Sequence, residues 1–230
     1  MDDSDCDPEA LALTYRHFAT VNAAVSDIRG IFRRDIAPRA RDLARAGDRP
    51  LRVLDIGTGG ADLPRALLAR AERAGLPLEV VAIDPDSRAL AWARQQPVPP
   101  RLTLREVSTA ELCAEGERFD VVLSNHVIHH LDAPSLGALL ADSEALLAPG
   151  GLAVHHDLAR SRLGYVGYDL GMRVLYPVLF RGSFLHVDGL ISIRRAHTVA
   201  ELGAAVPEGW TVSPYRVPWR LVARFERTDG

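Results

Sequence analysis

The chain has 230 residues, enough for one large domain with a substantial core, and its 47% apolar and 25% charged residues are typical of globular proteins. Its 27 basic residues, all arginine, are scattered among 30 acidic ones, and the net charge of −3 without a basic stripe argues against a nucleic-acid partner. No apolar run approaches a membrane span, the acidic start cannot open a secretory signal, and two cysteines are too few for a disulfide framework. We therefore predict a cytoplasmic protein.

The first part of the chain is predicted to be helical. Apolar residues recur at helical spacing over 9–46, and Gly30 and Pro38 are the expected breaks. The stretch 47–50 (GDRP) then indicates a turn, after which the pattern changes.

From residue 51, short apolar runs alternate with helical patterns. Strands are expected at 51–56, 78–83, 101–107, 119–125 and 152–158, and helices at 62–75, 86–96 and 135–148. Nearly continuous apolar strands separated by amphipathic helices indicate a parallel sheet buried on both faces. The predicted fold class is therefore α/β: a three-layer αβα, doubly wound, mostly parallel sheet.

The last third of the chain departs from this rhythm. An aromatic-rich helix is expected at 165–180, and two antiparallel strands around Pro214 and Pro218 would complete a seven-stranded sheet. We expect one domain, residues 1–230. Its parts are an N-terminal helical lid (1–47), a cofactor-binding core (48–158), an insert that caps the substrate (159–200) and C-terminal strands (201–230).

The stretch VLDIGTGGAD (53–62) places three glycines directly after the first strand. In an open parallel sheet, ligands bind beyond the carboxyl ends of the strands, and glycine lets a ligand lie against bare backbone. A dinucleotide site requires a small residue where this chain has Asp62, and a carboxylate there would repel a pyrophosphate. This argues against NAD(P) as the ligand, although a plain turn explains such a loop equally well.

The loop resembles the first motif of class I S-adenosylmethionine-dependent methyltransferases, D/E-x-G-x-G-x-G, except that Ala61 replaces the last glycine. The resemblance implies that Asp55, Gly57, Thr58 and Gly59 contact S-adenosylmethionine. It also implies that the acid ending the second strand, Asp84 with Pro85 after it, binds the ribose. The alternative is that this DPDS stretch (84–87) only caps a helix, with Asp86 as N-cap.

Two further stretches carry the resemblance. After the third strand, Ser108 and Thr109 correspond to the adenine-binding positions, although a capping box from Ser108 to Glu111 explains them as well. At the end of the fourth strand, Asn125 and His126 occupy positions that line the methionine part of the cofactor in the family. This strand lacks the N/D-P-P-Y of enzymes that methylate DNA bases.

Histidines gather at the ends of strands four and five, namely His126, His129, His130, His155 and His156. Histidine is suited to proton transfer near neutral pH, so we predict His130, Asp157 and His186 as catalytic residues. Structural roles are the alternative: histidines bonded to backbone, and a turn at Gly189 for the HVDG stretch (186–189). Strand alternation allows only one of His155 and His156 to share a face with Asp157. Metal-ligand types are present, but we expect no metal.

The lid and the insert supply seven aromatic residues that could enclose an acceptor or simply build a core: Tyr15, Phe18, Tyr165, Tyr168, Tyr176, Phe180 and Phe184. The layout resembles the quinone-biosynthesis and polyketide-tailoring branch of the family. That resemblance implies a small phenolic or quinol-like acceptor, methylated on oxygen or carbon, and is compatible with a homodimer. The alternatives are an NAD(P)-dependent oxidoreductase and a non-catalytic protein that keeps the fold.

Overall fold

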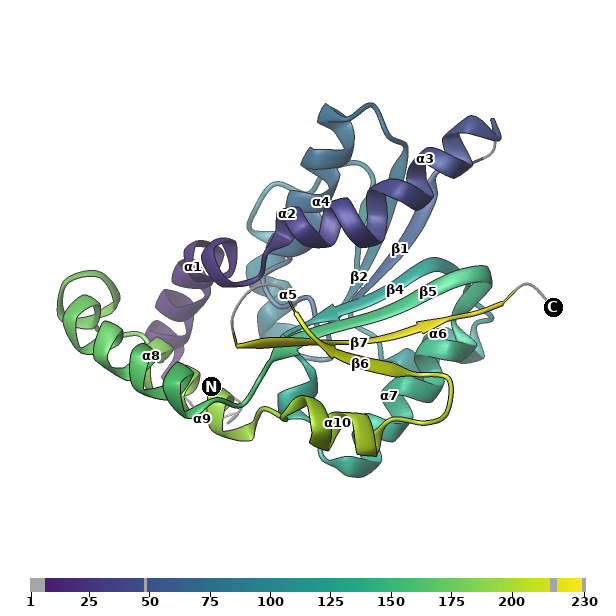
Figure 1. Ribbon diagram of the computed structural model, residues 1–230. Coiled ribbons are helices and arrows are strands. Elements are labelled where there is room, and N and C mark those ends of the chain that lie inside the picture. Colours follow the sequence, from purple (N-terminus) through teal and green to yellow (C-terminus); the bar gives the residue numbers. More distant parts are fainter. Residues whose placement is uncertain (1–6, 48, 216–218, 229–230) are drawn as a thin grey trace.

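The computed structural model describes residues 7–47, 49–215 and 219–228, with the backbone alone for residues 8 and 18–25. Seven strands in this part of the chain form one sheet in the order β3-β2-β1-β4-β5-β7-β6, with helices on both faces (Figure 1). The strands are β1 (Leu51–Ile56), β2 (Leu78–Ile83), β3 (Leu102–Arg105), β4 (Phe119–Asn125), β5 (Leu147–Leu158), β6 (Thr211–Pro214) and β7 (Arg220–Glu226). β1 to β5 run parallel, and β7 lies antiparallel to both β5 and β6. The predicted fold class is confirmed.

The helices are α1 (Pro8–Val25), α2 (Ile28–Ile31), the π-helical η1 (Phe32–Ile36), α3 (Ala37–Arg45), α4 (Asp62–Arg73), α5 (Ser87–Arg94), α6 (Thr109–Ala114), the 3-10 turn η2 (Ile128–His130), α7 (Ala133–Ala145), α8 (Arg162–Leu175), the π-helical η3 (Tyr176–Phe180), α9 (Leu185–Arg195) and α10 (Val199–Ala205). Most of the helices pack on the two faces of this sheet, and α8, η3 and α9 lie beyond its edge. One core cluster joins α2, η1, α3 and α4 to the sheet, and a second joins α6, α7 and α10 to the opposite face. None of the helices in the described ranges is both long and apolar enough to span a membrane.

The strands are buried on both sides, as their apolar runs predict. Val53 and Val121 point into the first cluster, while Leu54 and Val122 point into the second. Because successive side chains of a strand alternate between faces, an uninterrupted apolar run supplies both cores at once. The rigid sheet then presents the carboxyl ends of β1, β2 and β4 at a single edge.

The breaks expected in the N-terminal helices at Gly30 and Pro38 are wrong. The chain breaks at Ser26 and Asp27 instead, where Asp27 has a left-handed φ of 42° and its side chain accepts a hydrogen bond from the Gly30 backbone N–H. Gly30 lies inside α2, and the position favours glycine because a Cβ there would stand 2.0 Å from Oδ2 of Asp27. Pro38 lies in the first turn of α3, where its missing N–H removes no hydrogen bond.

Two other expectations need correction. β5 begins at Leu147 and not at residue 152, so it includes the PGG stretch that was expected to separate helix from strand. The turn considered at Gly189 is wrong, because His186, Asp188 and Gly189 all lie within α9. Figure 1 shows α8 and the segment after it at the edge of the molecule, away from the sheet. Pro218 lies outside the described residues.

Candidate functional site

The loop after β1 has the backbone conformation that its glycines allow. Gly57, Gly59 and Ala61 have φ values of +67°, +54° and +58°, so Ala61 keeps the left-handed backbone of the glycine it replaces. A Cβ at Gly57 would lie 2.6 Å from Cγ2 of Val127, whereas one at Gly59 would meet nothing within 4 Å. Gly57 is therefore required by packing against the loop after β4, and Gly59 keeps bare backbone facing open space.

Asp55 provides a buried carboxyl beneath this loop. Its Oδ2 and the hydroxyl of Thr58 are both enclosed and have no hydrogen-bond partner within the described part of the chain. Burial raises the pKa of Asp55 to about 7, with nearby Thr58 opposing the rise and the charge of Asp84 adding to it. A buried carboxyl without a partner is costly, so these two atoms suit a ligand that brings donors and positive charge.

Asp84 lies at the end of β2, beside the same loop. Its Oδ2 accepts from the Gly59 backbone N–H at 2.8 Å and its Oδ1 from the Asp86 N–H at 2.9 Å. Burial raises the pKa of Asp84, and these two hydrogen bonds oppose the rise. Each carboxylate oxygen retains acceptor capacity, as binding a ribose requires. Asp86 caps α5, so the capping role is confirmed for Asp86, while Pro85 is exposed beside it.

Ser108 and Thr109 lie at the start of α6, and both hydroxyls are engaged in the fold. Ser108 and Glu111 form the expected capping box, and Thr109 Oγ1 donates to Oδ2 of Asp142 at 2.5 Å. Contacts from this turn to an adenine ring would therefore come from the backbone or from hydroxyl lone pairs. The sequence pattern favoured the box and the adenine contact equally, and the structure confirms the box.

The end of β4 carries a closed ring of polar contacts. The Asn125 amide donates to the Ser26 hydroxyl at 2.9 Å, and Arg220 donates to Asn125 Oδ1 at 2.6 Å. His126 closes the ring, because its Nε2 lies 3.0 Å from an Arg220 nitrogen and 3.3 Å from Ser26 Oγ. Because guanidinium can only donate, His126 Nε2 accepts and its proton lies on Nδ1. Burial, with the charge of Arg220 next, lowers the pKa of His126 to about 3. His126 is thus a neutral hydrogen-bond donor.

Arg220 was missed in the sequence, although an arginine opening the apolar run RLVARF (220–225) was a usable signal. It lies on β7, and burial lowers its pKa to about 10, with Asp157 opposing the change, so it stays charged at neutral pH. His126 has a left-handed φ of 64°, unusual for a residue with a Cβ. Strained backbone of this kind gathers at functional sites, and here the polar ring holds it in place.

His129 and Asp157 form a buried pair between η2 and the end of β5. His129 Nδ1 lies 2.6 Å from Asp157 Oδ1, and the His129 backbone N–H donates to Oδ2 at 2.8 Å. Burial opposes ionisation of Asp157, but the hydrogen bond and charge of His129 outweigh it and lower the pKa of Asp157. The carboxylate therefore accepts from Nδ1–H, and Nε2 is the ring nitrogen of His129 that lies outside this pair.

The other histidines lie in different surroundings, which depend on the element that carries each of them. His130 is exposed beside His129, with ring centroids 4.2 Å apart. His155 bonds to Ser124 and stacks on Trp210, and burial lowers its pKa to about 3. His156 points to the opposite face, as alternation predicts.

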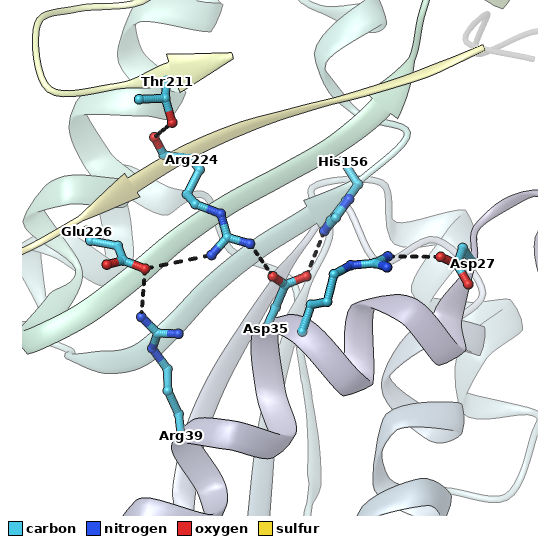
Figure 2. Close-up of polar contacts among 8 residues, drawn as sticks. Asp27, Asp35, Arg39, His156, Thr211, Arg224 and Glu226 are labelled. Carbon is cyan, nitrogen blue, oxygen red and sulfur yellow. Dashed lines mark hydrogen bonds and ion pairs between the residues drawn. The ribbon is translucent and has the colours of Figure 1, made fainter. Parts of the chain in front are cut away.

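Figure 2 shows the surroundings of His156, where it meets Asp35. Its Nε2 donates to Asp35 of η1 at 3.0 Å, and Asp35 also pairs with Arg224. Burial lowers the pKa of His156, while Asp35 opposes this change. Since Asp35 and His156 are both buried, the pair joins the N-terminal helices to β5 and has a structural role.

The predicted residues of the lid and the insert meet each other above the sheet edge. His186 Nε2 lies 2.9 Å from Asp169 Oδ1, which ties α9 to α8, whereas Asp157 pairs with His129. The Phe184 backbone N–H donates to Thr14 of α1 at 2.8 Å, and Tyr15 stacks on Trp92 of α5. The side chain of Phe18 lies outside the described residues. Where side chains are described, no three His, Cys, Asp or Glu groups converge in a metal-like cluster.

Comparison with known proteins identifies sequence relatives of this chain. A family model described as a methyltransferase domain matches residues 29–206. The ubiquinone biosynthesis O-methyltransferase of Roseobacter denitrificans is 32% identical over 192 residues, covering 80% of this chain and 73% of that protein. The protein of the same name from Azorhizobium caulinodans is 29% identical over 210 residues, covering 87% and 79%.

Solved structures share the fold at low identity. The plantazolicin methyltransferase BpumL, in complex with a pentazolic desmethylPZN analog and SAH, aligns with a TM-score of 0.62 and 12% identity over 95% of both chains. An O-methyltransferase family protein from Burkholderia thailandensis aligns with a TM-score of 0.63 and 16% identity, covering 94% of this chain and 59% of that one.

Proposed function

We propose that this chain, which belongs to the S-adenosylmethionine-dependent methyltransferase family, methylates a hydroxyl of a small phenolic or quinol-like acceptor. The observation that carries the proposal is the buried His129–Asp157 pair beside the loop after β1. Val127, two residues before His129, packs on Gly57, so the loop after β4 lies directly against the loop after β1.

The donor site follows from the polar groups at the sheet edge. Asp55 and Thr58 offer enclosed atoms that have no hydrogen-bond partner among the described residues, and these atoms fit the charged amino-acid end of the donor. Asp84 would accept from the ribose hydroxyls, and Gly59 leaves the backbone open to close approach. When bound, S-adenosylmethionine supplies an electrophilic methyl group on a positively charged sulfur. The acid-rich loop suits that charge.

The acceptor hydroxyl needs a base, and His129 has the arrangement of one. Asp157 holds the Nδ1–H tautomer and would stabilise the imidazolium after Nε2 takes the proton, the same division of labour as in other histidine–aspartate pairs. The neutral Nδ1–H of His126 could hydrogen-bond an acceptor or donor oxygen. We therefore assign the base to His129 in place of His130, and keep Asp157 as the group that orients it.

The acceptor class rests on two supports. The relatives in Roseobacter denitrificans and Azorhizobium caulinodans are both named ubiquinone biosynthesis O-methyltransferases. The lid and the insert also meet through Tyr15 and Phe184, which share an apolar cluster with Trp92. Trp92 lies against Gly60 of the donor loop, so these rings suit a flat aromatic acceptor. His186 belongs to the insert that covers the site, and any role it has there would be exerted through its contact with Asp169. The cytoplasmic location, the absence of a nucleic-acid partner and a homodimer stay predictions.

The test is transfer of labelled methyl from S-adenosylmethionine to a panel of catechols and hydroquinones, with the same compounds already methylated on oxygen and with anilines as comparisons. We expect label only where a free phenolic hydroxyl is present, and a methyl ether as product. Label on carbon or nitrogen of a blocked acceptor, or none on any phenol, would overturn the proposal. S-adenosylhomocysteine should raise the melting temperature, while NADH should not.

A further inference from the structure

A groove rich in arginine lies where α2 and η1 meet α4. The helices α2 and α4 are in contact (Figure 1), and the groove has a volume of about 410 Å³. It is lined by Arg29, Phe32 and Arg33 on one side and by Arg70, Arg73 and Ala74 on the other. This volume falls in the range of small-molecule sites, roughly 300–1,000 Å³.

The four arginines form two pairs of like charge. Arg29 and Arg33 are four residues apart and Arg70 and Arg73 are three apart, spacings at which like charges on a helix repel each other. The helix dipole favours Arg70 and Arg73, which lie near the end of α4. It disfavours Arg29, which lies in the first turn of the continuous helical segment 28–45. The dipole therefore does not explain the whole cluster.

The acids near the groove do not neutralise these arginines. No acidic residue lines it, and no carboxylate in the described ranges forms an ion pair with any of the four. Asp27 pairs with Arg34, and Asp35 is buried against β5. Glu72 adjoins Arg73 in α4, but adjacent residues of a helix do not face each other. The groove therefore concentrates positive charge in a chain whose net charge is −3.

We propose that this groove binds an anion that carries two or more linked phosphate groups, such as pyrophosphate or the diphosphate of a nucleotide. Guanidinium groups bind phosphate oxygens through paired, charge-assisted hydrogen bonds. A terminal phosphate presents three acceptor oxygens where a carboxylate presents two, and a second phosphate lets arginines from both sides bind the same ligand. Phe32 is only 8% exposed and offers little surface for stacking a base, so the phosphates carry the recognition.

The groove is separate from the proposed donor site. Arg70 follows Asp62, the first residue of α4, by eight residues, which is about 12 Å along the helix at about 1.5 Å per residue. S-adenosylmethionine carries no phosphate, and four arginines would repel its positive charges. Anion binding in the groove therefore needs neither the donor nor methyl transfer, and it does not rest on the proposed function.

The experiment is calorimetric titration of the full chain with pyrophosphate, adenosine diphosphate, orthophosphate and citrate, at low salt and without divalent metal. We expect the two diphosphates to bind at least about tenfold more tightly than orthophosphate or citrate, because both pairs of arginines contribute. Binding should weaken as salt increases. Tighter binding of adenosine diphosphate than of pyrophosphate would support a nucleotide as the source of the phosphates, and equal affinities would support the diphosphate alone.

Three double variants test the residues. Arg29→Gln with Arg33→Gln, and separately Arg70→Gln with Arg73→Gln, should each weaken pyrophosphate binding by about tenfold or more. The control, Arg41→Gln with Arg94→Gln, removes two exposed arginines of α3 and α5 outside the groove and should weaken it by less than about threefold. The melting temperature and the affinity for S-adenosylhomocysteine should stay near wild type in all three, which separates this test from that of the enzyme assignment.

The proposal is overturned if pyrophosphate does not bind, or if orthophosphate or citrate binds as tightly. It is also overturned if the control loses as much affinity as the groove variants, since attraction to the overall charge would then explain the binding. Tighter binding of a short RNA or DNA duplex through the same arginines would likewise contradict it, because the groove would then serve a nucleic acid.

Discussion

Asp55→Asn tests the buried carboxyl beneath the donor loop, and its effect depends on pH. Burial raises the pKa of Asp55 to about 7, whereas the ordinary value is 3.8. The unfolded chain therefore releases this proton above pH 3.8, while the folded chain holds it until about pH 7. The stability of the free enzyme falls as pH rises through this window and then levels off. A shift of about three pKa units corresponds to about 4 kcal/mol at pH 8.

Asparagine cannot ionise, so the free variant should unfold at higher urea concentration than wild type at pH 8 and lose this advantage by pH 4. Donor binding should respond in the opposite sense, because a cationic ligand next to Asp55 favours the carboxylate. Wild-type affinity for S-adenosylhomocysteine should rise by up to about tenfold per pH unit below 7 and then plateau. Affinity of the variant should be weaker and nearly independent of pH over this range.

Urea denaturation between pH 4 and 8 and calorimetric titration in two buffers with different ionisation enthalpies measure these effects. Asp42→Asn, the same chemical change at an exposed acid on α3, is the matched control. Parallel stability curves for wild type and Asp55→Asn across the whole range would refute the reasoning, since they would mean that Asp55 ionises equally in both states.

Three further changes test neighbouring groups. Asp84→Ala should weaken binding of S-adenosylhomocysteine by about 1–3 kcal/mol in calorimetry, the cost of lost charged hydrogen bonds; unchanged affinity would remove its ribose role. Gly59→Val should reduce donor affinity more than Gly59→Asn, which tolerates a left-handed φ and has a smaller side chain; equal affinities would argue against close backbone approach. Asp157→Asn should lower kcat by about 10²–10⁴, whereas His130→Gln should change kcat by less than about tenfold; the reverse order would return the catalytic role to His130.

Much of the fold could be predicted because its signals are local. Strands buried on both faces require uninterrupted apolar runs, and the left-handed turns at Gly57 and Gly59 strongly favour glycine. The N-terminal break escaped prediction because it depends on a left-handed Asp27, a conformation that sequence pattern rarely signals for a residue other than glycine. Ala61 shows the same limit, since it adopts the conformation of the glycine that the motif lacks.

The site was harder to predict because its partners are distant in sequence. Which of two adjacent histidines faces Asp157 is decided by the 3-10 turn η2, and spacing alone does not encode that choice. Arg220 reaches Asn125 only because β7 lies beside β5 in the sheet. His155 and His156 show the converse case, where strand alternation alone separates their faces.

The central claim is that His129, oriented by Asp157, takes the proton of the acceptor hydroxyl. The most direct measurement is kcat for wild type and His129→Gln against a series of phenols whose own pKa values range from near neutral to strongly basic. We predict that the loss in the variant is small for phenols that ionise unaided and grows as the phenol becomes less acidic. A loss of equal size across the series would contradict the account, because misfolding or misplacement of the acceptor affects every phenol alike.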